Sequence, residues 1–145
     1  MRLEIKFDEN LIPSVYTNYS KFIYRQMKRQ VHLIVLKNYK KYQIREDLVR
    51  NCGLIKWKGD PSPLDLVRYV ENCLQLVKDK GVYVVRINPY LRVKNSYTPI
   101  ATLVKILEYG TEKIPELPIL RRVFMYYRLH YKYLFVEYMK ERYSG

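Results

Sequence analysis

The segment of residues 98–124, TPIATLVKILEYGTEKIPELPILRRVF, most constrains how this chain can fold. Thr98 and Pro99 are typical of a helix start, because a hydroxyl caps free N–H groups and proline lacks the N–H that would go unpaired there. Gly110 predicts the end of that helix, since glycine adopts the left-handed conformation without steric cost. The Pro-x-x-Pro sequence at 115–118 predicts an extended strut. We therefore expect two helices joined by a fixed bend.

Both predicted helices carry apolar residues at three- and four-residue steps, which place them along one face of a helix. These residues are Ile100, Leu103, Val104 and Leu107 in the first helix, and Leu117, Leu120, Val123 and Phe124 in the second. Glycine and proline are common at helix ends, so an ordinary elbow without a function of its own is one interpretation of the segment.

The sequence of this segment also resembles the signature of a protein family. It is similar to the small tail-component proteins of long-tailed bacteriophages, in which Glu-aromatic-Gly-Thr is followed by a short spacer, Pro-x-x-Pro and a basic residue. The matching positions are Leu107, Glu108, Tyr109, Gly110, Thr111, Pro115, Pro118, Leu120 and Arg121. The family pattern also includes Pro-x-x-Thr-Gly-x-Leu before the central strands, and this chain departs from it, since residues 60–66 read DPSPLDL.

The resemblance implies a structural virion protein of the phage neck, a tail-completion or head–tail joining protein. Such a protein would form a homo-oligomeric ring of six or twelve copies, assembled in the host cytoplasm. Its neighbours would be the head connector or adaptor and the tail tube or terminator proteins, with DNA in the channel. The resemblance implies no enzyme activity, cofactor, metal or membrane partner.

The last predicted helix, from about residue 117 to 142, has an apolar stripe with alternating four- and three-residue steps. The stripe consists of Leu120, Phe124, Tyr127, Tyr131, Leu134 and Tyr138. This seven-residue repeat favours another helix alongside. Because Tyr126, His130 and Tyr133 lie elsewhere on the helix, we expect it either to be sandwiched within the domain or to contact another subunit. The stripe is a candidate subunit interface.

Positive charge is concentrated in the first third of the chain. The sequence has 27 Lys and Arg against 14 Asp and Glu, a net charge of +13. Residues 19–50 hold nine of the basic residues and two of the acidic ones. An excess of this kind favours a polyanion or an acidic protein surface as a neighbour.

A helix over residues 19–38, starting at Ser14 or Asn18, separates apolar from basic positions. One face has Ile23, Met27, Val31 and Ile34, and the opposite face has Lys21, Arg25, Lys28, Arg29 and His32. The basic face is expected to contact an acidic partner or DNA, and a merely solvated surface is the other interpretation.

Residues 51–63 predict a loop with several Gly and Pro residues, and it includes Lys56-Trp57-Lys58. A tryptophan between two lysines suits base stacking or a protein contact, whereas packing on the domain's own core is the other interpretation. An alternative function, a nucleic-acid-binding module, would use Lys21, Arg25, Lys28, Arg29 and Trp57.

The remaining patterns predict an α+β fold in a single domain of residues 1–145, with a small antiparallel sheet packed by several helices. Alternation over residues 2–7 predicts a strand. Residues 1–18 would then lie in the chain's own sheet or form an extended arm that joins a neighbour's sheet. Residues 82–87 and 90–94 predict a hairpin.

Two further helices are expected between the basic helix and that hairpin. The apolar positions at residues 44–49 predict one helix, with a break or a bend at residues 39–42. The apolar spacing after Ser62 and Pro63 predicts the other, which continues through residue 80 and ends at Gly81.

The sequence lacks the usual patterns of a catalytic or metal site, such as a phosphate-binding Gly loop or a His-rich spacing. Glu108 is expected to bond neighbouring N–H groups or to pair with Arg121 or Arg122. Cys52 and Cys73 are typical of buried reduced thiols. No run of eighteen apolar residues and no signal peptide is present, so a cytoplasmic origin is expected.

Overall fold

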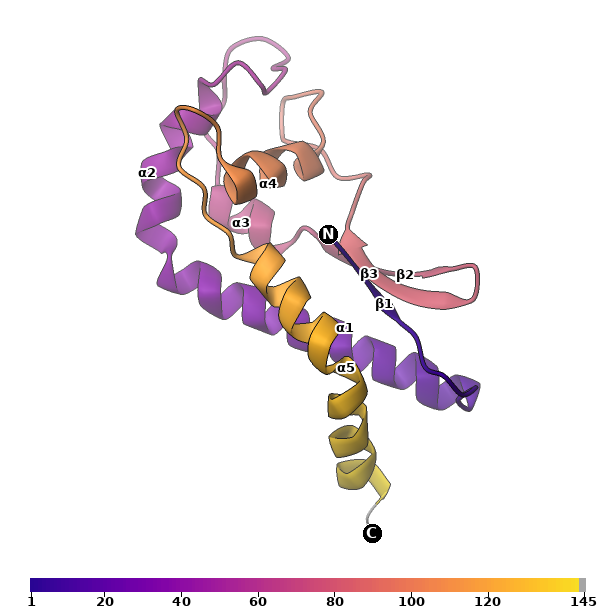
Figure 1. The fold of residues 1–145 in the computed structure, drawn as a ribbon. Helices are drawn as coiled ribbons and strands as arrows, with labels where there is room; N and C mark the ends of the chain where they lie inside the picture. The colour runs from indigo at the N-terminus through magenta and orange to yellow at the C-terminus, as the bar shows by residue number, and fades with distance from the viewer. Residues whose placement is uncertain (144–145) are drawn as a thin grey trace.

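The computed structural model describes residues 1–143, which fold as five helices and one three-stranded sheet (Figure 1). The helices are α1 (Pro13–Lys37), α2 (Tyr39–Arg50), α3 (Leu66–Glu71), α4 (Ile100–Tyr109) and α5 (Leu120–Tyr143). The strands are β1 (Arg2–Ile5), β2 (Leu74–Asp79) and β3 (Val82–Ile87). The predicted α+β class with a small antiparallel sheet and a long C-terminal helix is confirmed.

The first strand belongs to the chain's own sheet. The strand order is β1-β3-β2, and both pairs are antiparallel. The hydroxyl of Tyr16 donates to the Ile5 carbonyl at 2.6 Å and accepts from the Tyr83 N–H at 2.8 Å, which ties α1 to β1 and β3. In this structure, residues 2–5 lie in the chain's own sheet and not in an extended arm.

The hairpin lies one strand earlier than predicted. It joins β2 to β3 through Lys80 and Gly81, whose φ angles are 51° and 80°. Two consecutive positive φ angles are typical of the tight turn that matches the twist of paired strands. Residues 90–94 do not form the expected strand, because their only bridge joins Arg92 to Pro99.

The helix predicted through residue 80 ends at Glu71. Asp65 caps its start by accepting from the Arg68 N–H at 3.2 Å, and the Asn72 side chain donates to the Arg68 carbonyl at 2.9 Å at its end. The residues that follow pair with β3, so tertiary hydrogen bonding overrides the helical spacing of the sequence. Gly81 therefore serves the hairpin turn rather than a helix end.

The N-terminal rod begins and bends at other residues than expected. Helix α1 starts at Pro13, which suits proline because the first helical N–H has no partner. The break from α2 falls at Asn38 rather than at residues 39–42. There the backbone N–H and the side-chain amide both donate to the Ile34 carbonyl, which closes α1 before the chain turns into α2.

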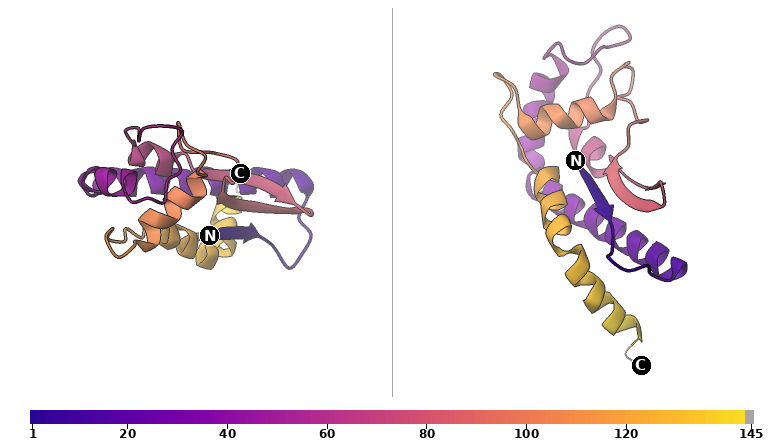
Figure 2. Two further views of the ribbon diagram at one scale, coloured as in Figure 1. Left: turned by 90° about the horizontal axis from the view of Figure 1, so that it is seen from above. Right: turned by 45° about the vertical axis from the view of Figure 1, so that its right-hand side comes forward.

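An aromatic part of the core lies where α5 crosses α1 (Figure 1). Tyr19 of α1 is fully buried, and its hydroxyl donates to the Tyr131 carbonyl of α5. Phe7 lies beside them, with its ring centroid 4.8 Å from that of Phe135. Strand β1 lies between β3 and α5 (Figure 2). Helix α4 and the loop of residues 51–63 lie at the other end of the molecule.

Candidate functional site

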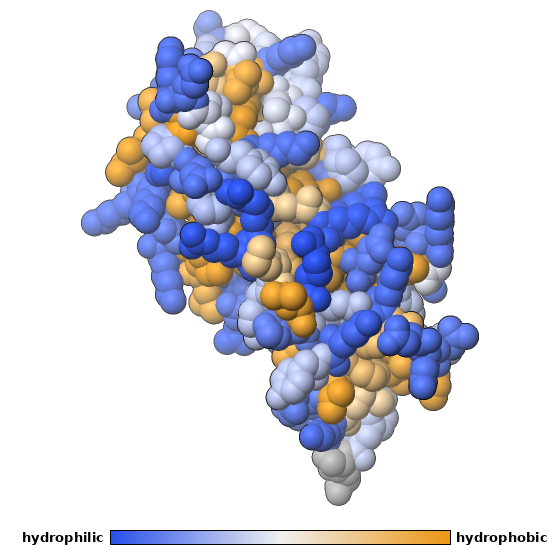
Figure 3. All heavy atoms as spheres, in the orientation of Figure 1, coloured by the Kyte–Doolittle hydropathy of each residue, from blue (hydrophilic) through white to orange (hydrophobic). Residues whose placement is uncertain are grey.

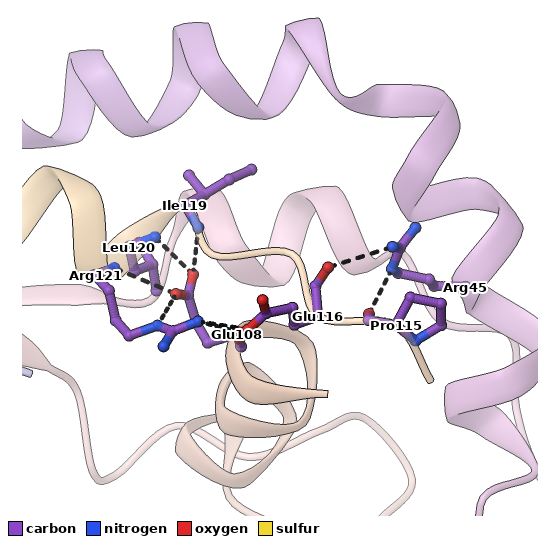
Figure 4. A network of polar contacts seen from close by, with 7 residues as sticks. All are labelled: Arg45, Glu108, Pro115, Glu116, Ile119, Leu120 and Arg121. Carbon is purple, nitrogen blue, oxygen red and sulfur yellow. Dashed lines mark hydrogen bonds and ion pairs between the residues drawn. The ribbon is translucent and has the colours of Figure 1, made fainter. Parts of the chain in front are cut away.

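The carboxylate of Glu108 closes the start of helix α5 (Figure 4). Glu108 lies near the end of α4 and is 2% exposed. Its Oε1 accepts from the N–H groups of Ile119 and Leu120 at 2.9 and 2.6 Å, and its Oε2 accepts from the Arg121 N–H at 3.3 Å. A helix start has unpaired N–H groups and partial positive charge, so a buried carboxylate is stabilised there. The predicted role of Glu108 is confirmed.

Arg121, rather than Arg122, is the charged partner of Glu108. Its Nε lies 3.4 Å from Glu108 Oε2, and its Nη2 donates to the Glu108 carbonyl at 2.6 Å. The same Nη2 donates to Glu116 at 3.2 Å, and the guanidinium carbon lies 4.2 Å from the centre of the Tyr109 ring. Arg121 thus joins both sides of the bend.

The turn after α4 requires glycine. Gly110 has φ 69° and ψ −178°, a combination that is essentially restricted to glycine. A Cβ atom there would lie 2.6 Å from the Ile114 carbonyl oxygen and 2.8 Å from the Glu116 nitrogen. Thr111 holds the loop against Gly110, because its N–H donates to the Ile114 carbonyl and its hydroxyl accepts from the Ile114 N–H.

The Pro-x-x-Pro strut is attached to two helices. The Arg45 side chain of α2 donates to the Pro115 carbonyl at 3.0 Å (Figure 4). The Leu117 N–H donates to the Leu107 carbonyl of α4 at 2.8 Å. Leu117 itself is buried, whereas Pro118 is half-buried at the start of the turn into α5. The strut therefore fixes the spacing between α2, α4 and α5.

These contacts bring the predicted motif together in one corner. The corner, which we call the elbow, contains Glu108, Tyr109, Gly110, Thr111, Pro115, Pro118 and Arg121. Both Glu108 oxygens accept hydrogen bonds from the chain itself, so this carboxylate is committed to holding the bend. The elbow sets the angle between α4 and α5.

The apolar stripe predicted as a subunit interface is instead used within the chain. Five of its residues, Leu120, Phe124, Tyr127, Tyr131 and Tyr138, are buried, and Leu134 is half-buried. They pack against α1 and β1 because the seven-residue spacing fits a helix crossing within the domain. Burial within the chain corrects the prediction of a contact with another subunit for the five buried residues.

A second apolar face runs along the outside of α5. Met125, Leu129 and Tyr133 are 59%, 71% and 65% exposed, and helical spacing places them in one line. The full outer face comprises Met125, Tyr126, Leu129, Tyr133 and Val136. Apolar groups are visible among polar ones over α5 in Figure 3. In the sequence, the extra aromatic residues Tyr126 and Tyr133 indicated a second apolar face on this helix. The pattern did not show which of the two faces would be exposed.

A groove borders this outer face where α5 and α1 diverge. Its volume is about 540 Å³, and Phe22 and Gln26 of α1 line one wall. Arg122, Tyr126 and Leu134 line the wall formed by α5. The groove is therefore continuous with the outer face through Tyr126.

The basic residues predicted on α1 share one exposed face, but Trp57 does not join them. Lys21, Arg25, Lys28 and Arg29 are all exposed. Trp57 lies on the loop beyond the far end of α2 (Figure 1). It is half-buried, packs against the core, and its ring N–H donates to the Arg50 carbonyl at 3.2 Å. The interpretation of Trp57 as a core-packing residue is supported.

The two cysteines differ in their burial. Cys73 is buried, as expected, and burial raises the pKa of its thiol to about 12, whereas Cys52 is half-buried. Within residues 1–143, no group of three or more His, Cys, Asp or Glu side chains could hold a metal ion. No helix in that range is both long and apolar enough to span a membrane.

Comparisons with known protein families, curated proteins and solved structures give no match to this chain. Its function is therefore inferred from the geometry of the elbow and its surrounding surfaces, together with the motif resemblance.

Proposed function

We propose that this chain is a structural protein of the neck of a tailed phage, where copies form a ring that joins the head connector to the tail. The proposal combines the resemblance of the elbow sequence to tail-completion proteins with the geometry of that corner. Hydrogen bonds made by Glu108, Arg121 and Pro115 hold α4, the strut and α5 in one arrangement. A fixed angle between rods is what a closed ring requires of each subunit.

The observation that carries the proposal is the exposed apolar face of α5. The helix has 24 residues, and its outer face exposes five large apolar or aromatic side chains on one side. Isolated apolar residues are common on protein surfaces, whereas a contiguous apolar patch marks an interaction site. Aromatic residues and Met are also enriched at protein interfaces.

The positive charge of each subunit affects contacts between copies and contacts with other proteins in opposite ways. Each subunit carries +13, so charge opposes contact between copies and favours contact with acidic neighbours. Contacts between copies would therefore depend on apolar area, which the outer face of α5 supplies. Connector or tail proteins with acidic surfaces would bind the basic parts of the ring.

A triple variant of the outer face tests this proposal. Met125→Gln, Leu129→Gln and Val136→Gln remove apolar contact area while keeping residues that favour helix formation. The matched control replaces three exposed apolar residues elsewhere, Ile44→Gln, Leu48→Gln and Leu54→Gln. Because all six side chains are exposed, circular dichroism should show a wild-type fold for both variants.

Assembly is then measured by mass photometry and negative-stain imaging with the connector particles of the same phage. We expect the wild type and the control to add a ring to the connectors, and the α5 variant to remain unassembled. Equal assembly by the α5 variant would contradict the proposal. Failure of all three proteins to bind connectors would contradict the assignment to the neck.

A further inference from the structure

The exposed side of α1 presents four cations in a line. Lys21, Arg25, Lys28 and Arg29 span about 12 Å of helix at 1.5 Å per residue. Within residues 1–143, none of the four forms an ion pair with a carboxylate. Lys28 lies over the ring of Tyr24, with 5.4 Å between its Nζ and the ring centre. Their charges are therefore not neutralised by the chain itself.

A groove between α1 and the edge strand β2 extends this surface. Its volume is about 450 Å³, and its lining includes Lys21 and Arg25 on α1 with Gln75 and Asn88 from the sheet side. The oxygen of Gln75 accepts from Arg86 Nε at 3.0 Å, and the oxygen of Asn88 accepts from the backbone N–H that follows Pro89 at 2.9 Å. Both amides therefore keep their NH₂ groups as donors for an external partner.

The carboxylates that border this region already have side-chain partners within the chain. Glu71 of α3 bonds His32 at 2.8 Å, and Asp79 of β2 bonds Arg2 at 2.9 Å. The groove lining between them includes the donors Lys21, Arg25, Gln75 and Asn88 beside Leu74 and Leu76, and it includes no carboxylate. A surface with this composition selects anions and discriminates against cations.

We propose that this surface binds the phosphate backbone of double-stranded DNA. The donor surface comprises Lys21, Arg25, Lys28, Arg29, Gln75 and Asn88. A line of cations suits a polyanion, because duplex DNA carries one charge per roughly 1.7 Å of its axis. A protein partner would need an apolar centre at the interface, but the large exposed apolar residues of α1, Leu33 and Leu36, lie past one end of the line of cations. Contacts to phosphates alone make the binding independent of sequence.

The proposal goes beyond the neck assignment and does not require it. The donor surface lies beside β2, whereas Phe22 and Gln26 of α1 face the groove on the α5 side. One molecule can therefore use the outer face of α5 for a protein and the donor surface of α1 for DNA. In a ring, the donor surface would then be free to face a duplex.

The test measures fluorescence anisotropy of a labelled duplex of about 20 base pairs from roughly 50 to 300 mM KCl. The first variant carries Lys21→Gln, Arg25→Gln, Lys28→Gln and Arg29→Gln. The matched control carries Lys56→Gln, Lys94→Gln, Lys105→Gln and Lys113→Gln, four exposed lysines away from the donor surface. Both variants lower the net charge from +13 to +9, so only the position of the lost charge differs.

We expect the donor-surface variant to reduce the slope of log affinity against log salt by about 3 to 4, because each phosphate contact contributes about 0.9. The control should change the slope by less than about 1. The double variant Gln75→Glu and Asn88→Asp should also weaken DNA binding at least severalfold, since it places carboxylates where donors stood. The α5 variant should keep wild-type DNA affinity, which separates this inference from the neck assignment.

Three outcomes would overturn the inference. Equal loss of slope in both quadruple variants would mean that net charge, and not this surface, attracts DNA. Wild-type affinity in the double variant would exclude the groove beside β2. Binding of poly-glutamate but not of the duplex would identify an acidic protein as the partner.

Discussion

At the scale of single residues, Glu108 shows how a buried charge becomes stabilising. Removing a carboxylate from water is costly unless hydrogen bonds and an opposite charge compensate it. Here three N–H groups at the start of α5 and the guanidinium of Arg121 supply both. The usual side-chain cap comes from the residue before the helix, but here it comes from the preceding helix.

The variant Glu108→Gln should lower the free energy of unfolding by about 2 to 3 kcal/mol, because an amide keeps the shape but loses the charge and one acceptor. Urea unfolding followed by circular dichroism measures the loss. The control Glu112→Gln, exposed on the same loop, should stay within about 0.5 kcal/mol of the wild type. Similar losses in both variants would mean that the cap contributes little.

At Gly110 and Thr98, sequence rules succeeded where the conformation is local and failed where the partner is distant. Gly110 was predicted as a helix end because its backbone conformation is a local property. Thr98 was predicted as a helix cap, but its hydroxyl accepts from the Lys56 N–H at 2.8 Å. That contact links residues 42 positions apart, and no local pattern indicates it.

At the scale of elements, the same distinction explains β2. Leu74 and Val77 have the spacing of a helical face, whereas Leu74 and Leu76 have the spacing of one strand face, so the apolar residues could not distinguish the two. The decisive features are the Asn72 bond that ends α3 and the turn at residues 80–81 that returns the chain onto β3. Two residues with positive φ, one of them lysine, gave too weak a turn signal in the sequence.

The connection between α4 and α5 should be intolerant of any side chain at Gly110. We expect Gly110→Ala to destabilise the protein by about 3 kcal/mol or more, because it adds a clash with backbone atoms to the cost of positive φ. Gly53→Ala is the matched control, since Gly53 has φ 80° and open space around it, and it should cost only about 1 to 2 kcal/mol. Urea unfolding of both variants gives the difference, and equal costs would refute the steric argument.

At the scale of the whole molecule, the fold separates its surfaces by chemistry. The apolar repeat of α5 that was predicted to bind another subunit packs in the chain's own core. The exposed surfaces are then the apolar outer face of α5 and the basic side of α1. Which of two apolar faces is buried depends on where α1 crosses α5, and this is a property of the assembled domain. The sequence could therefore predict the long helices and the basic face, but not the exposed face.

The buried tyrosines should make the folded protein sensitive to alkali. Burial raises the pKa of Tyr127 to about 12 and also raises the pKa values of Tyr19 and Tyr42. In the unfolded chain these phenols lose their protons near pH 10. Stability from each is complete below that pH and is lost as the pH rises toward the folded value, because the unfolded state then binds fewer protons.

The variant Tyr127→Phe isolates this contribution, because phenylalanine keeps the ring and cannot ionise. From about pH 10 to 12, the free energy of unfolding of the wild type should fall more steeply than that of the variant, by about 1.4 kcal/mol per pH unit. Urea unfolding at a series of pH values measures both slopes. Parallel slopes would mean that Tyr127 ionises equally readily in both states, and the packing of α5 on α1 would then be looser than its burial indicates.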